Sequence, residues 1–484
     1  LGLHAPQIEV EVHISSGLPS LTIVGLPEAA VRESKDRVRS AIINSGFLFP
    51  TKRLTINLAP ADLPKDGSRL DLPIALGILI ASGQLPENCT DGFEFIGELA
   101  LDGHLRPVSG TLTIAMACQQ ARHRLLLPVG NLDEASQLPE FEVYAASHLQ
   151  QVCAHFLGSS PLKAAPQKSM AASSRYPFDL ADVKGQLRPR RALEIAAAGG
   201  HSLLFKGPPG TGKTLLASRL PSILPPLNAQ ENLEVASIYS VANAQHTFGQ
   251  RPFRAPHHTA SAIALVGGGS QPKPGEITLA HLGVLFLDEL PEFDRKVLEV
   301  LRQPLESKEI VISRAARQMT FPANFQFIAA MNPCPCGYAF NQDSRCQCSP
   351  ESIQRYQNRI SGPLLDRIDL HIDVPPLQAN ELQERTPSEN SETVRQRVMK
   401  AYQQQIQRQQ CLNQALSPTL LEQYACLDDS SSKIIEMAQQ RLNLSARAYH
   451  RVLRVARTIA DLAESEIISS SHLTEALSYR GHST

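Results

Sequence analysis

The chain has no tryptophan, and aromatic residues make up only 5% of its 484 residues. Neither sign of charge is in excess, since 46 Lys and Arg stand against 47 Asp and Glu and the net charge is −1. A globally basic binder of polyanions is thereby excluded, so any contact with nucleic acid must come from local basic patches. Nine cysteines in a chain of this length do not form a disulfide scaffold.

Long hydrophobic runs are also missing. The longest, residues 72–81, is far shorter than the roughly 20 residues that a membrane-spanning helix needs. No signal peptide is visible, so we expect a soluble cytoplasmic protein without a membrane partner. A hydrophobic content of 42% with 19% charged residues is that of an ordinary globular protein.

Composition and periodicity divide the chain into regions. Residues 158–176 are rich in Ser, Ala, Pro and Lys and lack apolar periodicity, which predicts a linker. Before it, residues 1–157 mix alternating β-type segments with helical ones and indicate an α+β domain. Residues 177–377 alternate apolar strands with helical segments, which is typical of an α/β domain with a parallel sheet covered on both faces. Residues 390–484 show a helical pattern without strand signals.

The strongest motif is GPPGTGKT at residues 207–214, which lies between a short apolar strand and a helix. Two glycines let the backbone curl so that its N–H groups point at a phosphate, and the helix N-terminus adds partial positive charge. Lys213 would reach the β- and γ-phosphates, and the hydroxyl of Thr214 would be a magnesium ligand. The predicted ATP-binding residues are Gly207, Pro208, Pro209, Gly210, Thr211, Gly212, Lys213, Thr214 and Asp288.

Two further apolar strands end in polar side chains. The strand at residues 283–287 is followed by Asp288, which would hold Mg²⁺ together with Thr214, and by Glu289, which would orient and deprotonate the attacking water. The strand at 325–331 is followed by Asn332, which would hydrogen-bond the γ-phosphate and that water. The alternative for Asn332 is a turn-forming residue before a proline.

Arg367 precedes a further apolar strand. Its guanidinium would reach a neighbouring subunit's nucleotide as an arginine finger, a contribution of about 10³–10⁵ in rate where measured. The alternative is an ion pair within the chain, with Asp366 or Asp369. The predicted catalytic residues of the core are therefore Glu289, Asn332 and Arg367.

Together these motifs resemble the AAA+ ATPases, and specifically the YifB/ComM family of the magnesium-chelatase-like branch. The resemblance covers essentially the whole chain and is carried by the motifs at residues 183–186, 192–200, 251–258, 274–289 and 360–369. It implies an AAA+ core preceded by a Lon-protease-like domain and followed by a helical lid. The family further implies a hexameric, ATP-driven ring on DNA that promotes branch migration during natural transformation.

The resemblance also bears on one arginine of the last region. Residues 445–449 are similar to the segment that carries the sensor-2 arginine, which would put Arg447 over the nucleotide from the lid and adds it to the catalytic set. Arg447, Arg451 and Arg454 share one helix face, and a solvated basic face is the alternative explanation.

Lon-like domains can hydrolyse peptides with a Ser–Lys pair, because a serine needs an adjacent base to become a nucleophile. Here Arg69 falls near the expected serine position, and Ser68 lies one place away. The segment that should supply the lysine, residues 97–114, contains none. We therefore expect this domain to be proteolytically inactive.

A cysteine cluster follows Asn332 directly, in an insertion at residues 334–348. Its CxC…CxC pattern consists of Cys334, Cys336, Cys346 and Cys348. Four thiolates can close a tetrahedral zinc site. Reduced cysteines packed in a loop and an adventitious disulfide are the alternatives.

Two insertions in the core, at residues 251–274 and 307–321, carry basic residues that would follow a phosphate backbone without reading sequence. The candidates are Arg254, Lys273, Arg314 and Arg317, and solvated turn charges are the alternative for each.

We expect an ATP hydrolase with ATP and Mg²⁺ as cofactors, and with structural Zn²⁺ if the cysteines bind it. The leading hypothesis is a hexameric DNA helicase for branch migration, acting on single-stranded or branched DNA. The second is a chelatase-type motor that remodels a protein partner for metal insertion. An ATP-dependent protease is the third, and the missing Ser–Lys pair counts against it.

Overall fold

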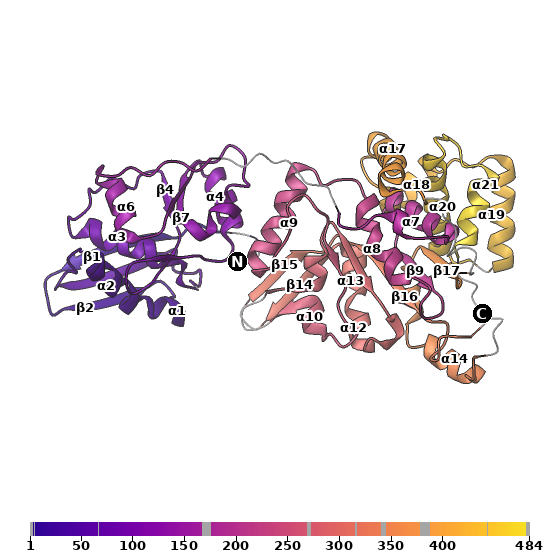
Figure 1. Cartoon of the computed structure of the whole chain (residues 1–484), viewed down its shortest axis with the longest axis horizontal. Coiled ribbons are helices and arrows are strands. Elements are labelled where there is room, and N and C mark those ends of the chain that lie inside the picture. Colours follow the sequence, from indigo (N-terminus) through magenta and orange to yellow (C-terminus); the bar gives the residue numbers. More distant parts are fainter. Residues whose placement is uncertain are drawn as a thin grey trace. The chain divides into compact units, whose positions relative to one another are not determined.

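The computed structural model describes residues 3, 5–65, 67–166, 176–268, 273–314, 317–339, 345–377, 388–442 and 444–480. The chain forms two compact units (Figure 1). One comprises Leu1–Ala171 with Ala236–His246, and the other Ala172–Val235 with Thr247–Thr484. Of the predicted linker, residues 167–175 lie outside the described part of the chain.

The first unit is an α+β structure with two main sheets. In one, β3 (Arg53–Ala59) lies between β1 (Glu9–Ser15) and β2 (Ser20–Val24), antiparallel to the first and parallel to the second. In the other, β4 (Phe93–Phe95), β7 (Arg124–Pro128) and β8 (Val143–Ala146) are parallel. A short pair joins β5 (Glu98–Leu99) to β6 (Leu105–Arg106). The helices are α1 (Ala29–Arg32), α2 (Ser34–Asn44), α3 (Asp71–Ala81), α4 (Thr111–Gln120), α5 (Leu132–Ala135) and α6 (Leu149–Phe156).

The longest apolar run of the sequence forms α3. Its side chains, among them Leu72, Ile74 and Ile78, are buried in the core of this unit. An apolar run of this length is thus a core helix, as its length predicts. None of the helices within the described residues has both the length and the apolar character needed to span a membrane.

The second unit is built on a five-stranded parallel sheet in the order β10-β13-β16-β9-β17. The strands are β9 (Leu203–Lys206), β10 (Phe253–Arg254), β13 (Val284–Leu287), β16 (Gln326–Met331) and β17 (Leu370–Asp373). β13 is buried along its whole length because helices cover both faces of the sheet, which explains its unbroken apolar sequence. The predicted α/β core with a parallel sheet is confirmed.

Helices and short strands connect and cover this sheet. They are α7 (Leu187–Gly199), α8 (Lys213–Ile223), α9 (Ala229–Ala242), α10 (Ala262–Val266), α11 (Glu276–Leu279), α12 (Arg295–Val300), α13 (Arg302–Ser307), α14 (Pro350–Gln357) and α15 (Gly362–Leu365). β11 (Gly267–Gly268) pairs with β12 (Lys273–Pro274), and β14 (Glu309–Arg314) pairs with β15 (Arg317–Pro322).

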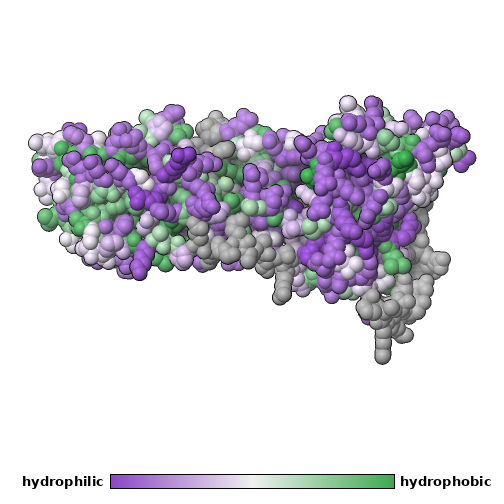
Figure 2. Space-filling model, turned by 90° about the horizontal axis from the view of Figure 1, so that it is seen from above, coloured by the Kyte–Doolittle hydropathy of each residue, from purple (hydrophilic) through white to green (hydrophobic). Residues whose placement is uncertain are grey.

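The end of the chain is a helical lid, made of α17 (Ser391–Gln409), α18 (Pro418–Tyr424), α19 (Asp429–Leu442), α20 (Ala446–Leu462) and α21 (Ser470–Ser478). Val452, Val455 and Ile459 of α20 join the same hydrophobic core as the sheet strands. Hydrophilic residues predominate on the face of the second unit seen in Figure 2.

Three arginines of α20 are held by polar groups of the chain, whereas Arg447 on the same helix is exposed. Arg451 donates to the backbone oxygen of Ile368, and Arg454 donates to that of Leu416. Arg457 is 1% exposed and pairs with Asp461. These contacts with carbonyl oxygens and a carboxylate tie the lid together and to the core.

Candidate nucleotide-binding and hydrolysis site

The order of the strands brings three predicted segments together at the carboxyl ends of the sheet. β13, β16 and β9 are adjacent and parallel, and each is followed by polar residues: Asp288 and Glu289, Asn332, and the phosphate-binding loop 207–214. Carboxyl ends of parallel strands are where open α/β sheets bind ligands. Segments that are far apart in sequence therefore form a single site.

The phosphate-binding loop is open where a phosphate would lie. Gly210 and Gly212 have φ of +77° and +86°, a region that residues with a Cβ rarely adopt. A Cβ built on either glycine would meet nothing within 4 Å. The backbone between the strand and α8 thus curls around free space at a helix N-terminus, which suits an anion.

Lys213 is 8% exposed and lies inside this loop. Its Nζ donates to the backbone oxygens of Gly207 and Pro208, both at 2.8 Å, and to Oδ1 of Asn332 at 3.1 Å. Burial lowers the pKa of this ammonium group, and the carboxylates of Asp288 and Glu289 counteract the shift. The ammonium group is therefore held at the site, and it contacts the residue predicted to sense the γ-phosphate.

Thr214 and Asp288 meet as predicted for a magnesium pair. The Thr214 hydroxyl donates to Oδ2 of Asp288 at 2.6 Å. A hydroxyl and a carboxylate are hard oxygen donors, the kind that Mg²⁺ takes beside nucleotide phosphates. The donor set therefore fits the ion.

Glu289 has an unforeseen partner. Its backbone is left-handed, with φ of +51°, and its Oε2 lies 3.2 Å from Nδ1 of His258. The ring of His257 instead contacts the hydroxyl of Thr259 at 2.8 Å. The two histidines are consecutive within the motif at residues 251–258, but the sequence pattern by itself does not reveal which one reaches the carboxylate.

Arg367 lies at the opposite end of the strands, where their amino ends are. Its backbone oxygen accepts from the hydroxyl of Ser202, the residue before β9, whereas the phosphate-binding loop follows β9. The four residues of this strand span about 13 Å. Arg367 is thus separated from the chain's own phosphate-binding loop by the length of the strand.

Arg367 and Arg447 bind the same carboxylate. Nη2 of Arg367 donates to Oε1 of Glu306 at 2.6 Å, and Arg447 donates to the same oxygen. Together the two guanidinium groups hold the pKa of Glu306 below its usual value, mainly through the hydrogen bond from Arg447. The structure thus brings Arg447 and Arg367 together on one carboxylate oxygen. The intramolecular partner of Arg367 is Glu306 and not the neighbouring Asp366 or Asp369.

One more residue supports the loop. Gln186 belongs to the motif at residues 183–186, and its side chain donates to the backbone oxygens of Pro375 at 2.7 Å and Thr211 at 3.4 Å. This side chain ties the entry to α7 to the phosphate-binding loop. The motif was recognisable in the sequence, but the contacts of its glutamine were not.

In the first unit, the hydroxyl of Ser68 donates to a carboxylate oxygen of Glu98. The buried Lys65 donates to the backbone oxygen of Pro60. These contacts pair the serine with an acid and the lysine with a carbonyl group. They give no support to a Ser–Lys protease, whose serine hydroxyl needs the amine as its base.

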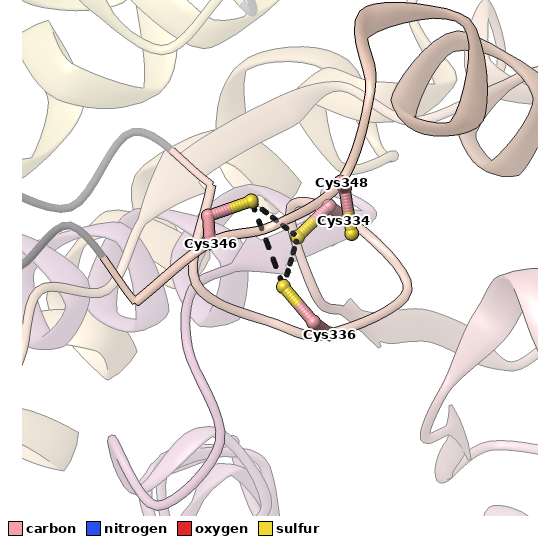
Figure 3. Close-up of side chains that lie close together, drawn as sticks. All are labelled: Cys334, Cys336, Cys346 and Cys348. Carbon is pink, nitrogen blue, oxygen red and sulfur yellow. Dashed lines mark hydrogen bonds between the residues drawn. The ribbon is translucent and has the colours of Figure 1, made fainter.

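The four clustered cysteines converge on one point (Figure 3). Their sulfur atoms all lie within 4.8 Å of one another. Sulfur–sulfur contacts join Cys334 to Cys336 at 3.3 Å, Cys334 to Cys346 at 3.8 Å and Cys336 to Cys346 at 3.6 Å. All four are free thiols. A disulfide has about 2.05 Å between its sulfur atoms, so none of these pairs is bonded in the structure.

The predicted DNA contacts differ in their surroundings. Arg254 forms a two-pronged ion pair with Glu276, at 2.6 and 2.7 Å. Lys273 is exposed on β12. Arg314 and Arg317 face each other in register at the end of the β14–β15 hairpin, and their side chains lie outside the described part of the structure.

A phosphate-binding loop after a central strand, with carboxylates and an asparagine on the two adjacent strands, defines a P-loop ATPase core of the AAA+ type. Sequence models of the magnesium chelatase subunit ChlI match residues 179–382 and, for its C-terminal part, 388–480. A further model, subunit ChlI of Mg-chelatase, matches residues 10–131. Family models thus cover both units of the chain.

Relatives support the same assignment. The uncharacterized protein YifB of Escherichia coli is 51% identical over 484 residues, which is 99% of this chain and 95% of that protein. Competence protein ComM of Haemophilus influenzae is 50% identical over 488 residues, 99% and 96% of the two chains. The magnesium-chelatase 38 kDa subunit of Rhodobacter capsulatus is 22% identical over 333 residues, 64% and 89%. The chain belongs to the YifB/ComM family of magnesium-chelatase-like AAA+ ATPases.

Proposed function

We propose that the protein hydrolyses ATP between the subunits of a hexameric ring and uses this energy to move on DNA in the cytoplasm, promoting branch migration during natural transformation. The single observation that carries the shared site is the position of Arg367. It lies at the edge of the sheet opposite the phosphate-binding loop of the same chain, next to Ser202. An arginine at this position would reach the nucleotide that is bound by a neighbouring subunit. Arg447, which binds the same Glu306 carboxylate, would face the same neighbour.

The chemistry follows from the side chains at the carboxyl edge. Lys213 would exchange its carbonyl partners for the β- and γ-phosphate oxygens. Thr214 and Asp288 would hold Mg²⁺, which neutralises charge on those oxygens. Glu289 would take the proton of a water whose oxygen attacks the γ-phosphorus, while the bond to the bridging oxygen breaks and ADP leaves with its electrons. Asn332, already bonded to Lys213, would align this water.

The DNA assignment is supported by the relative named competence protein ComM and by the basic hairpin. One face of the β14–β15 hairpin packs on the core through Ile310 and Ile312, and its tip carries Arg314 and Arg317. A hairpin fixed at its base and basic at its tip suits contact with a phosphate backbone that is independent of sequence. Lys273 would add to this contact, and Arg254 would do so only if its pair with Glu276 opens.

The second candidate is a chelatase-type motor that remodels a protein partner for metal insertion. It is favoured by the matches of residues 10–131, 179–382 and 388–480 to models of the magnesium chelatase subunit. The two candidates share the hydrolytic site and differ in what stimulates it. Stimulation by a chelatase partner protein, with no response to nucleic acid, would replace the DNA proposal by this one.

ATP turnover is expected to rise severalfold with single-stranded or branched DNA, and this stimulation should fade between about 50 and 200 mM salt as counterions compete. The measurement is phosphate release with and without DNA, beside a size determination in the presence of ATP. Replacing both Arg314 and Arg317 by Ala should weaken DNA binding and reduce its salt slope by about 2. The matched control is Arg302→Ala, since Arg302 pairs with Glu299 on the neighbouring helices. Equal turnover with every nucleic acid would reject the DNA assignment.

His258→Ala is expected to raise the DNA-independent rate by about twofold to tenfold, the range that corresponds to one hydrogen bond of ~0.5–1.5 kcal/mol. The His258 ring competes with the attacking water for the Glu289 carboxylate, so its removal frees the base. His257→Ala is the control, because its ring contacts Thr259 and not Glu289. Steady-state phosphate release distinguishes the two variants. An identical effect of both would show that the contact with Glu289 has no role.

A further inference from the structure

The four cysteines of the insertion do not behave as packed hydrophobic side chains. Free cysteines that serve packing are among the most buried residues. Cys334 is buried, but Cys336 is exposed, and Cys346 and Cys348 are partly exposed. Packing therefore explains one of the four thiols and leaves the convergence of the other three without a cause.

The spacing of the sulfur atoms matches a metal site. Zn–S bonds of about 2.3 Å in a tetrahedron place the sulfur atoms about 3.8 Å apart. Three sulfur–sulfur separations in the structure are 3.3, 3.6 and 3.8 Å, and the sulfur of Cys348 lies within 4.8 Å of the other three. The backbone N–H of Ala339 also donates to the sulfur of Cys334 at 3.2 Å, an outer contact of the kind that orients metal ligands.

The cysteine-bearing turn is in direct contact with the phosphate-binding loop. The N–H of Gly337 donates to the backbone oxygen of Cys334 at 3.0 Å and closes the turn. A Cβ on Gly337 would lie 2.5 Å from Cδ of Pro209 and 2.8 Å from its Cγ. No side chain fits between the turn and the loop, so a displacement of the turn would be felt by Pro209.

The same segment begins at the residue that contacts Lys213. Cys334 follows Asn332 after a single proline, and the side chain of Gln357 donates to the backbone oxygen of that proline at 3.1 Å. Cys348 lies two residues before α14, the helix that carries Gln357. A metal that joins Cys334 and Cys336 to Cys346 and Cys348 would therefore fasten the exit of β16 to the entry of α14.

We propose that Cys334, Cys336, Cys346 and Cys348 bind one Zn²⁺ ion, and that this ion holds the turn at Gly337 against Pro209 so that the phosphate-binding loop keeps its nucleotide-binding shape. Each thiol loses its proton to solvent when its sulfur binds the ion. The coupling to nucleotide rests on the proposed function, whereas the metal site does not.

The first test measures metal content in the purified full chain. We expect about one zinc per chain by elemental analysis, and the absorption of tetrahedral cobalt thiolate when Co²⁺ replaces zinc. Cys336→Ser with Cys346→Ser should abolish both signals. Cys426→Ser is the control, since Cys426 is exposed and lies outside the cluster. A wild-type chain without metal after growth with zinc, and unable to take up Co²⁺, would overturn the site.

The second test measures the affinity for ATP in the Glu289→Gln background, where hydrolysis is expected to stop. Gly337→Ala should retain zinc but weaken ATP binding about tenfold or more, because its methyl group would displace Pro209. Gly83→Ala is the matched control, with a similarly left-handed φ of +74° but open space around its Cβ. The cysteine double variant should lose affinity as Gly337→Ala does.

The outcomes separate the two proposals. If the Glu289→Gln chain binds ATP and neither Gly337→Ala nor zinc removal changes the affinity, the coupling is overturned while the ATPase proposal stands. If that chain fails to bind ATP although it carries zinc, the proposed function fails and the metal site stands.

Discussion

Glu289→Gln is expected to lower ATP turnover by at least about 100-fold, the lower end of what a general base contributes, while ATP affinity changes by less than about twofold. The amide cannot accept the proton of the attacking water, but it has nearly the same size and leaves Lys213, Thr214 and Asp288 in place. Phosphate release and equilibrium binding of a fluorescent ATP analogue measure the two quantities separately.

Glu292→Gln is the matched control for this substitution. Glu292 follows the same strand by a few residues, but its carboxylate pairs with Arg359 at 2.8 Å and not with a residue of the nucleotide site. It should therefore leave turnover nearly unchanged. Full turnover in the Glu289→Gln chain would remove this carboxylate from the mechanism and with it the assignment of β13 as the strand that carries the base.

Arg367→Ala is expected to lower the turnover rate by about 10³–10⁵, with ATP binding largely retained, if the arginine acts on the transition state of a neighbour's nucleotide. Lys213→Ala should also be inactive, because it removes the ammonium group from the phosphate-binding loop. The two defects lie at opposite edges of the sheet. In a ring they therefore fall on opposite sides of each subunit interface.

Mixing these two inactive proteins should restore activity. With random assembly, about a quarter of the head-to-tail interfaces combine an intact phosphate-binding loop with an intact Arg367. The mixture should thus recover a measurable share of the wild-type rate, whereas each variant alone stays inactive. Arg359→Ala serves as the control for loss of an arginine from the same region, since its guanidinium group pairs with Glu292 and not with Glu306, the carboxylate that holds Arg367. A mixture of assembled rings that is as inactive as its parents would place Arg367 outside the site.

Several parts of the nucleotide site were predictable because each motif is local. GPPGTGKT sets the backbone of residues 207–214 by its own glycines, and Asp288 follows an apolar strand directly in sequence. The unbroken apolar runs of the strands also predict a parallel sheet, because such runs are typical of a sheet that is covered by helices on both faces. The structure then confirms that these strands lie side by side in one sheet.

The contacts that were not predictable join residues far apart in the chain. Glu306 binds Arg367 and Arg447, which are 61 and 141 residues away, and His258 of the insertion at residues 251–274 meets Glu289 after β13. The arginines of α20 were open to interpretation as a solvated face, yet Arg451 is buried against Ile368. Charge and helical spacing give the face on which a residue lies, but not the element that covers this face.

The sequence by itself determined the family, the phosphate-binding loop and the residue types of the hydrolytic site, because short-range backbone geometry and strand-end chemistry are encoded within a few residues. Only the tertiary structure decided the partners: that Arg367 and Arg447 share Glu306 and that the turn at Gly337 rests on Pro209. The physical reason is that packing and ion pairing depend on distances in space. These distances are set by how the strands and helices assemble, and no local pattern records them.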